Sequence, residues 1–166
     1  MAPAPSVAER LRGPVVPLNV CFTEVGEVDL PAMLRYADWL CAQHVPVLLL
    51  TYGSSEYAWL SDDDLYRLTA EIAAVVAGRS CFVTSSSFWP AEVCAGFLHH
   101  AERVGVDAVK VQINMWAMAG AGAHRADLLR TYFDEAGAGS SIPLLLWCNS
   151  AGGEPMPMDL VAELAA

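Results

Sequence analysis

The sequence predicts an α/β fold with a parallel sheet, on three observations. Five short apolar runs recur along the chain, at residues 15–21, 45–51, 81–85, 107–113 and 142–148. Runs of this kind are typical of parallel strands buried on both faces. The segments between them have the 3.6-residue apolar period of amphipathic helices. Successive runs lie roughly thirty residues apart, which is the length of one βα unit, so the sheet is either open or part of a barrel.

Local signals place the helices between these runs. The apolar stripes are Leu30, Met33, Leu34, Ala37 and Leu40, then Leu65, Leu68, Ile72 and Val75, then Val93, Phe97, Ala101 and Val104. Residues typical of helix starts precede the stripes: they are Asp29, Ser61 and Pro90. Glycines suited to a left-handed cap follow the helices: they are Gly78, Gly105 and Gly137.

Size and charge restrict the class of protein. The chain has 166 residues, of which 55% are apolar and 17% charged, so we expect residues 1–166 to form a single domain with one core. A formal charge of -10 disfavours nucleic acids and anionic membranes as partners. The first residues carry no apolar run of the kind a secretory signal needs, and five cysteines form no C-x-x-C pair. We therefore expect a cytoplasmic protein that binds neither membranes nor nucleic acid.

Small polar residues recur where the predicted strands end, in residues 51–55, 84–87, 112–114 and 148–150. Parallel α/β folds bind their ligands at that edge of the sheet. The segment from Tyr52 to Glu56 is neither a G-x-G-x-x-G nor a Walker loop, so a nucleotide site is disfavoured. The three serines 85–87 lack the G-x-S-x-G surroundings of a nucleophile, so we expect them to line a pocket or cap a helix.

One segment resembles a known family. The stretch L-L-L-T-Y-G-S-S-E-Y-A-W-L-S, residues 48–61, is similar to the G-T-T-G-E-x-x-x-L-S stretch of the dihydrodipicolinate synthase and N-acetylneuraminate lyase family, with the register set by Glu56, Leu60 and Ser61. The family's first strand is similar to residues 13–17, and the turn into its first helix is similar to residues 26–29. The entry to its fourth strand is similar to residues 101–108, and its fifth strand is similar to residues 142–149. The resemblance implies a (β/α)8 barrel of which this chain holds about five strands.

The family resemblance also implies a function. Its members condense or cleave 2-oxo acids, or dehydrate sugar acids, through a Schiff base on a lysine of strand six, with no cofactor. The iminium acts as an electron sink for the neighbouring carbon. Small-molecule 2-oxo acids or sugar acids are therefore the expected partners, pyruvate being the simplest. The resemblance places Ala166 in the helix after strand five, so strands six to eight and that lysine lie outside this sequence.

Residue by residue, the catalytic groups of the family do not carry over. Its two threonines fall on Gly53 and Ser54, and its proton-shuttling tyrosine falls on Trp147, which cannot act as an acid or base at neutral pH. Trp116 lies in the segment that matches the family's paired tyrosines, and 150–153 has no cation to bind a carboxylate. The predicted substrate-binding residues are accordingly Gly53, Ser54, Ser55, Trp116 and Trp147, with no intact catalytic group.

Lys110 is the only lysine of the chain. The period of two along a strand puts it with Gln112 on the face opposite Val109, Val111 and Ile113. If those three pack on helices, Lys110 points into the barrel. A desolvated lysine can become a nucleophile, whereas the alternatives are a structural ion pair or a stem that extends to solvent.

Other candidates have weaker support. His99 and His100 are adjacent, not spaced by four, so we expect no metal site there. Four tryptophans, at positions 59, 89, 116 and 147, follow strand ends and either narrow a pocket or pack as core.

Two hypotheses of different classes remain. In the first, the chain is the amino-terminal part of a lyase that is active only when complete. In the second, it is a non-catalytic barrel remnant that assembles with itself or binds a small molecule. Because strands one and five would be open edges, we expect a homo-oligomer in either case.

Overall fold

The computed structural model describes residues 6–50, 57–113, 119–146 and 156–165. Five strands form one sheet in the order β1-β2-β3-β4-β5. They are β1 (Val15–Pro17), β2 (Val47–Leu50), β3 (Cys81–Ser85), β4 (Ala108–Val111) and β5 (Leu144–Leu146). All four pairings are parallel. Each strand lies within one predicted apolar run, so the predicted parallel α/β fold is confirmed.

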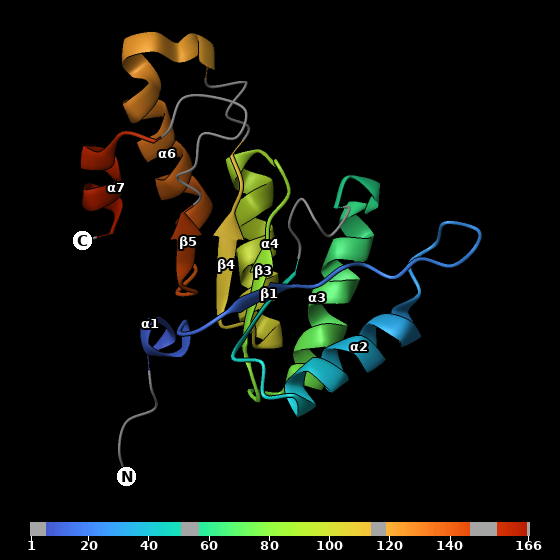
Figure 1. Cartoon of the computed structure of the whole chain (residues 1–166). Coiled ribbons are helices and arrows are strands. Elements are labelled where there is room, and N and C mark those ends of the chain that lie inside the picture. Colours follow the sequence, from blue (N-terminus) through green and yellow to red (C-terminus); the bar gives the residue numbers. More distant parts are fainter. Residues whose placement is uncertain (1–5, 51–56, 114–118, 147–155, 166) are drawn as a thin grey trace.

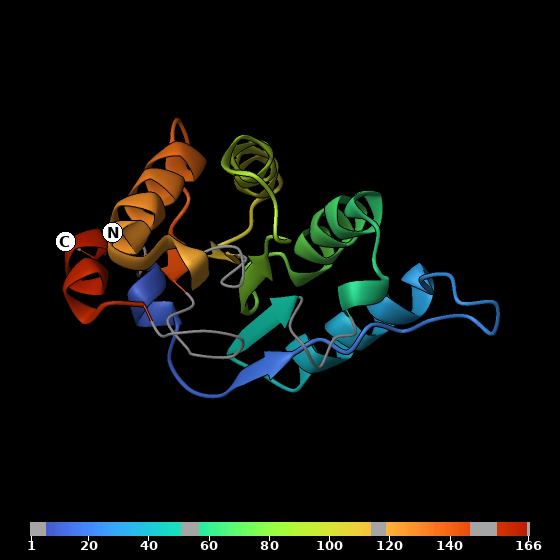
Figure 2. The same ribbon diagram turned by 90° about the horizontal axis from the view of Figure 1, so that it is seen from above.

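Helices alternate with the strands. The long ones are α2 (Leu30–Ala42), α3 (Asp62–Val76), α4 (Ala91–Val104) and α6 (Arg125–Gly137). Shorter elements are α1 (Val7–Arg10), α7 (Met158–Leu164) and the 3-10 helices η2 (Tyr57–Trp59) and η3 (Ala119–His124). Figure 1 shows the strands running side by side, and Figure 2, seen from above, shows the four long helices following one another around one side of the sheet. This is the arrangement of part of a (β/α) barrel.

The helix starts follow the predicted signals. The Asp29 side chain accepts a hydrogen bond of 2.9 Å from the backbone N–H of Ala32. Ser61 caps α3 by accepting from the backbone N–H of Asp64, whose carboxylate accepts from Ser61 in return. Such reciprocal capping satisfies N–H groups that have no partner inside the helix. Pro90 precedes α4 without a side-chain cap.

One of the three predicted helix ends needs correction. Gly105 is the left-handed cap of α4, as predicted, with a φ of 85°. After α3, Gly78 also has the predicted positive φ, 76°, and Ala77 before it is left-handed as well. Gly137 was predicted to follow its helix, but it is the last residue of α6, and Gly139 takes the positive φ instead. A glycine needs only to lie within a residue or two of the end to allow the chain to turn.

The sheet has a different environment on each face. On the outer face, alternate strand residues such as Leu48, Phe82 and Val109 join the helices in the main hydrophobic core. On the inner face, a small cluster of Val47, Cys81, Val83 and Ala108 contacts Leu49 and Leu145 and two residues at the chain start, Val7 and Leu11. The inner face is therefore apolar near the amino ends of the strands, where the segment containing α1 covers it.

Burial of the outer strands is less complete than predicted. Val15 of β1 is 50% exposed, and all three residues of β5 are half-buried. Within the described ranges each of these strands has one neighbour, whereas β2, β3 and β4 have two. The prediction that all five are buried on both faces is wrong for the two edges. On α4, the predicted stripe residue Val93 is 44% exposed, and its neighbour Cys94 is buried in its place.

Asp107 fastens α1 to the sheet. Its carboxylate accepts from the Arg10 guanidinium and, at 2.8 Å, from the backbone N–H of Phe82. Arg10 also donates to the carbonyl of Ser80 at 3.0 Å. The side chain of Arg10 is 26% exposed and that of Asp107 is 16% exposed, so this ion pair is mostly shielded from water.

Asp107→Ala is expected to lower the free energy of unfolding by about 2 kcal/mol, because it leaves a guanidinium and a strand N–H without their acceptor. Urea denaturation measures the change. The matched control is Asp38→Ala, which removes the exposed pair with Arg79 and should cost less than about 1 kcal/mol. Equal losses in the two variants would contradict the stabilising role assigned to Asp107.

Candidate functional site

All carboxyl ends of the strands lie at one edge of the sheet, at the top of Figure 1. The predicted substrate-binding residues fall in segments that follow β2, β4 and β5. Gly53, Ser54, Ser55, Trp116 and Trp147 all lie outside the described residues, so their placement stays a prediction. The described part of the edge comprises the last residues of β2 to β5 and, after β3 and β4, the residues just beyond them.

A buried polar link joins the ends of β3 and β4. The backbone N–H of Gln112 donates to Ser86 Oγ at 2.9 Å, and Gln112 Nε2 donates to the carbonyl of Ser86 at 2.7 Å. The N–H of Ser86 donates in turn to the carbonyl of Lys110. Ser86 and Gln112 are 0% and 2% exposed. Their hydrogen bonds are made within the protein, so they hold the two strand ends in register.

Neighbouring residues of β3 face opposite sides of the sheet. Thr84 Oγ1 lies 3.0 Å from Thr69 Oγ1 of α3, which places Thr84 on the outer, helix-covered face. Ser85 therefore faces inward, because side chains alternate along a strand. Its side chain is fully buried, and within the described residues Ser85 Oγ has no hydrogen-bond partner. A buried hydroxyl without a partner is costly, so it is a candidate for contact with a ligand.

Lys110 lies beside Ser85 on the inner face. The register pairs Lys110 with Ser85 of β3 on one side and with Leu145 of β5 on the other. Val109, Val111 and Ile113 belong to the outer core, which confirms the predicted inward direction of Lys110. Only 8% of Lys110 is exposed and its Nζ is buried, so the alternative of a stem extending to solvent is wrong. Burial lowers the pKa of Lys110 to about 8.

Arg125 is a buried cation that the sequence did not single out. It is the first residue of α6 and is 7% exposed. A cation in the first turn opposes the helix dipole, so packing elsewhere in the protein decides its position. In the sequence, the signal for a special role of Arg125 is its position in the first turn of a helix, where carboxylates are favoured over cations.

The histidines and the described cysteines do not form a metal centre. His100 Nε2 lies 3.1 Å from the carbonyl of Tyr66, and its ring packs against that tyrosine, so it joins α4 to α3. Among the described residues, no three potential ligands gather around one point. The described cysteines are free thiols, and burial raises the pKa of Cys81 and Cys94.

Two of the four tryptophans do not form a shared pocket. Trp89 is 9% exposed and packs against Phe97 and Tyr66, with ring centroids 5.1 and 6.0 Å apart. Trp59 is 79% exposed. Trp89 therefore belongs to the packing between helices α3 and α4, and the other two tryptophans lie outside the described residues.

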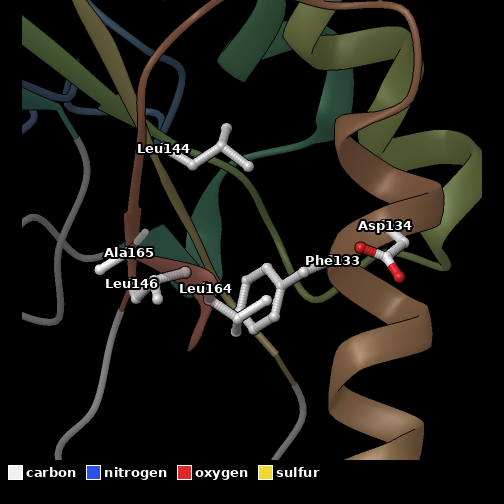
Figure 3. A pocket seen from close by; sticks show the side chains of 6 residues that line it. All are labelled: Phe133, Asp134, Leu144, Leu146, Leu164 and Ala165. Atoms are coloured by element: carbon white, nitrogen blue, oxygen red, sulfur yellow. The ribbon is translucent and has the colours of Figure 1, made fainter. Parts of the chain in front are cut away.

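A groove lies beside strand β5. It has a volume of about 370 Å³. Figure 3 shows its lining, which is Phe133, Asp134, Leu144, Leu146, Leu164 and Ala165. Five of these six side chains are apolar, and they come from α6, β5 and the end of α7. The groove suits apolar packing better than the binding of an acidic substrate.

Comparison with known proteins finds similarity both by sequence and by structure. No family model matches the chain. The L-2-keto-3-deoxyarabonate dehydratase of Azospirillum brasilense is 32% identical over 106 residues, which are 63% of this chain and 34% of that enzyme. No described helix is long and apolar enough to cross a membrane.

Solved structures share the fold at low identity. A dihydrodipicolinate synthase of Agrobacterium tumefaciens is 18% identical with a TM-score of 0.80, and the match covers 96% of this chain and 52% of that one. The N-acetylneuraminate lyase of Mycoplasma synoviae is 17% identical with a TM-score of 0.73, covering 90% and 50%. The chain thus spans about half of these structures. The resemblance to the dihydrodipicolinate synthase and N-acetylneuraminate lyase family is confirmed, and the chain has the fold of the amino-terminal part of that family's barrel.

Proposed function

We propose that this chain is part of a lyase or dehydratase that acts on 2-oxo acids or sugar acids through a lysine Schiff base. The observation that carries the proposal is the 32% identity, over 106 residues, to an enzyme named L-2-keto-3-deoxyarabonate dehydratase. The five-stranded parallel sheet with the fold of synthases and lyases supports it. The proposed chemistry needs neither a metal ion nor an organic cofactor.

The proposed substrate is a small anion that enters at the carboxyl edge of the sheet. In a Schiff-base mechanism the amine replaces the keto oxygen of the substrate, and the resulting iminium accepts the electrons of a breaking C–C or C–H bond. A buried amine supports this chemistry because desolvation favours its neutral, nucleophilic form. The protein is proposed to act in the cytoplasm, where thiols such as Cys41 and Cys94 stay reduced.

The test uses the gene product purified from its source cells. It is incubated with L-2-keto-3-deoxyarabonate, and separately with N-acetylneuraminate, and products are followed by mass spectrometry. We expect loss of water from the first or release of pyruvate from the second. Sodium borohydride added together with substrate, but not alone, should abolish turnover because it reduces the Schiff base. Turnover of neither compound, or turnover that resists borohydride, would contradict the proposal.

The second candidate function is assembly without catalysis. Two observations favour it: β1 and β5 each have one neighbour among the described strands, and an apolar groove lies beside β5. Open strand edges pair readily with other chains, so we expect the 166-residue chain to form a homo-oligomer. Light scattering should return a multiple of 17.8 kDa. A compact monomer of that mass would rule out self-assembly.

A further inference from the structure

A second groove lies between the loop that follows β1 and the start of α3. It has a volume of about 460 Å³, which is within the range of sites for small organic ligands. Phe22 and Glu27 line it from the loop, and Trp59, Asp64 and Arg67 line it from η2 and α3. None of these residues belongs to the candidate catalytic site, so the groove can be tested independently of the proposed function.

The loop wall of this groove is a short hairpin, drawn in blue at the right of Figure 1. Phe22 and Val28 form an antiparallel bridge. Inside the bridge, the backbone N–H of Thr23 donates to the carbonyl of Glu27 at 2.8 Å. The N–H of Gly26 donates to the carbonyl of Thr23 at 2.9 Å, and Gly26 permits this turn with a φ of 84°. These hydrogen bonds fix the backbone that carries Phe22 and Glu27.

The charged side chains of the groove leave it with an excess of negative charge. Arg67 donates to the Asp64 carboxylate at 3.1 Å, so this cation is paired within the protein. Asp64 also accepts from the N–H and the hydroxyl of Ser61. Within the described residues, the Glu27 carboxylate has no ion-pair or hydrogen-bond partner. Two carboxylates and one guanidinium give the described lining a charge of -1, which favours a cation over an anion.

The aromatic lining of the groove also suits a cation. Trp59 is 79% exposed, and its ring packs against no other aromatic ring of the described residues. Phe22 supplies a second ring from the hairpin. The face of an indole or phenyl ring attracts a cation, and sites of several rings bind methylated ammonium groups. Methyl groups on the nitrogen replace N–H groups that water would solvate, so they lower the cost of placing the cation against the rings.

We propose that this groove binds a small organic cation that carries a methylated ammonium group. The ammonium lies against the face of Trp59, with Phe22 on the hairpin side and the Glu27 carboxylate as its counter-ion. The ion pair of Asp64 with Arg67 bounds the groove at α3. The occupant is a free small molecule, because the volume of the groove is that of a small-ligand site.

The test is a titration of the 166-residue chain with choline chloride, followed by NMR at constant ionic strength. The ionic strength is held constant because a protein with a formal charge of -10 attracts any cation weakly. The reporters are the backbone amide of Gly26 and the indole N–H of Trp59, whose signal is identified by its absence in Trp59→Leu. We expect both signals to shift with a Kd of about 1 mM, because the rings and the carboxylate are exposed.

Two pairs of variants locate the site. Trp59→Leu should weaken binding about 10-fold because it removes the ring face, and Trp59→Phe, which keeps a ring, should lose less. The matched control is Trp39→Leu on α2, at a tryptophan that is 57% exposed and outside the lining, and it should bind as the wild type does. Glu27→Gln should weaken binding about 3-fold, whereas Glu24→Gln, exposed in the same hairpin and outside the lining, should not.

A neutral analogue tests whether the charge is recognised. The carbon isostere of choline, 3,3-dimethylbutan-1-ol, has the same shape without the charge, and equal affinity for it would overturn the recognition of a cation. Equal weakening in Trp59→Leu and Trp39→Leu, or no shift of either reporter at about 10 mM choline, would overturn the site. Tighter binding of a trimethyl-lysine peptide that depends on Trp59 would overturn the choice of a free small molecule.

Discussion

Lys110→Met is expected to stabilise the protein at pH 7, by at most about 3 kcal/mol, and the gain is expected to shrink as the pH rises from 8 to 10.5. The folded state holds the pKa of Lys110 at about 8, against a usual value of 10.5. Each unit of pKa shift corresponds to about 1.4 kcal/mol. Below pH 8 both the folded and the unfolded state carry the proton, so the wild type bears the full cost of burying the charge.

Between pH 8 and 10.5 the unfolded state binds the proton more tightly than the folded state. The free energy of unfolding of the wild type therefore rises with pH relative to Lys110→Met. Urea denaturation of both proteins at pH 7, 8, 9 and 10 measures the difference. Arg12→Met, at an exposed position, is the control and should track the wild type throughout. A variant less stable than the wild type at pH 7 would mean that the ammonium contributes more through its contacts than its desolvation costs.

Phe97→Ala is expected to lower the free energy of unfolding by about 4 kcal/mol. Phe97 of α4 is fully buried, and its ring lies 5.1 Å from those of both Tyr66 and Trp89, measured between centroids. Truncation removes these contacts and leaves a cavity between α3 and α4, which is the most costly kind of core substitution. Thermal or urea unfolding followed by circular dichroism measures the loss.

Val93→Ala provides the matched control, one helical turn earlier on the same helix. Val93 is 44% exposed, so its loss should change the free energy of unfolding by about 0.5 kcal/mol or less. If the two substitutions cost the same, the position of α4 against the outer core would be wrong.

The sequence predicts the order and type of the elements well because each depends on local pattern. Residues 81–85 form β3 as predicted, and Ser61 and Asp29 cap their helices. The errors arise where non-local packing decides. The apolar period of α4 includes Val93, yet the neighbouring helices bury Cys94 in its place. Burial of β1 and β5 depends on neighbouring strands, which a local apolar run cannot reveal.

The sequence likewise predicts those features of the candidate site that depend on local pattern, and not those that depend on contacts between strands. The alternation of residues along β4 predicts the inward direction of Lys110, because it needs only the period of a strand. The pairing of Lys110 with Ser85 depends on the register between β3 and β4. The hydrogen bonds between Ser86 and Gln112 help to hold that register. The order of residues alone predicts neither the register nor these hydrogen bonds. Gly53, Ser54, Ser55, Trp116 and Trp147 remain predicted substrate-binding residues.

The intact mass of the natural gene product, isolated from its source cells, tests the central claim most directly. The proposed lyase needs a closed barrel, and the chain spans 52% of the Agrobacterium synthase and 34% of the dehydratase. The account predicts a mass well above 17.8 kDa, with the further strands supplied by the same polypeptide. A mass of 17.8 kDa would contradict it and leave assembly between separate chains as the function.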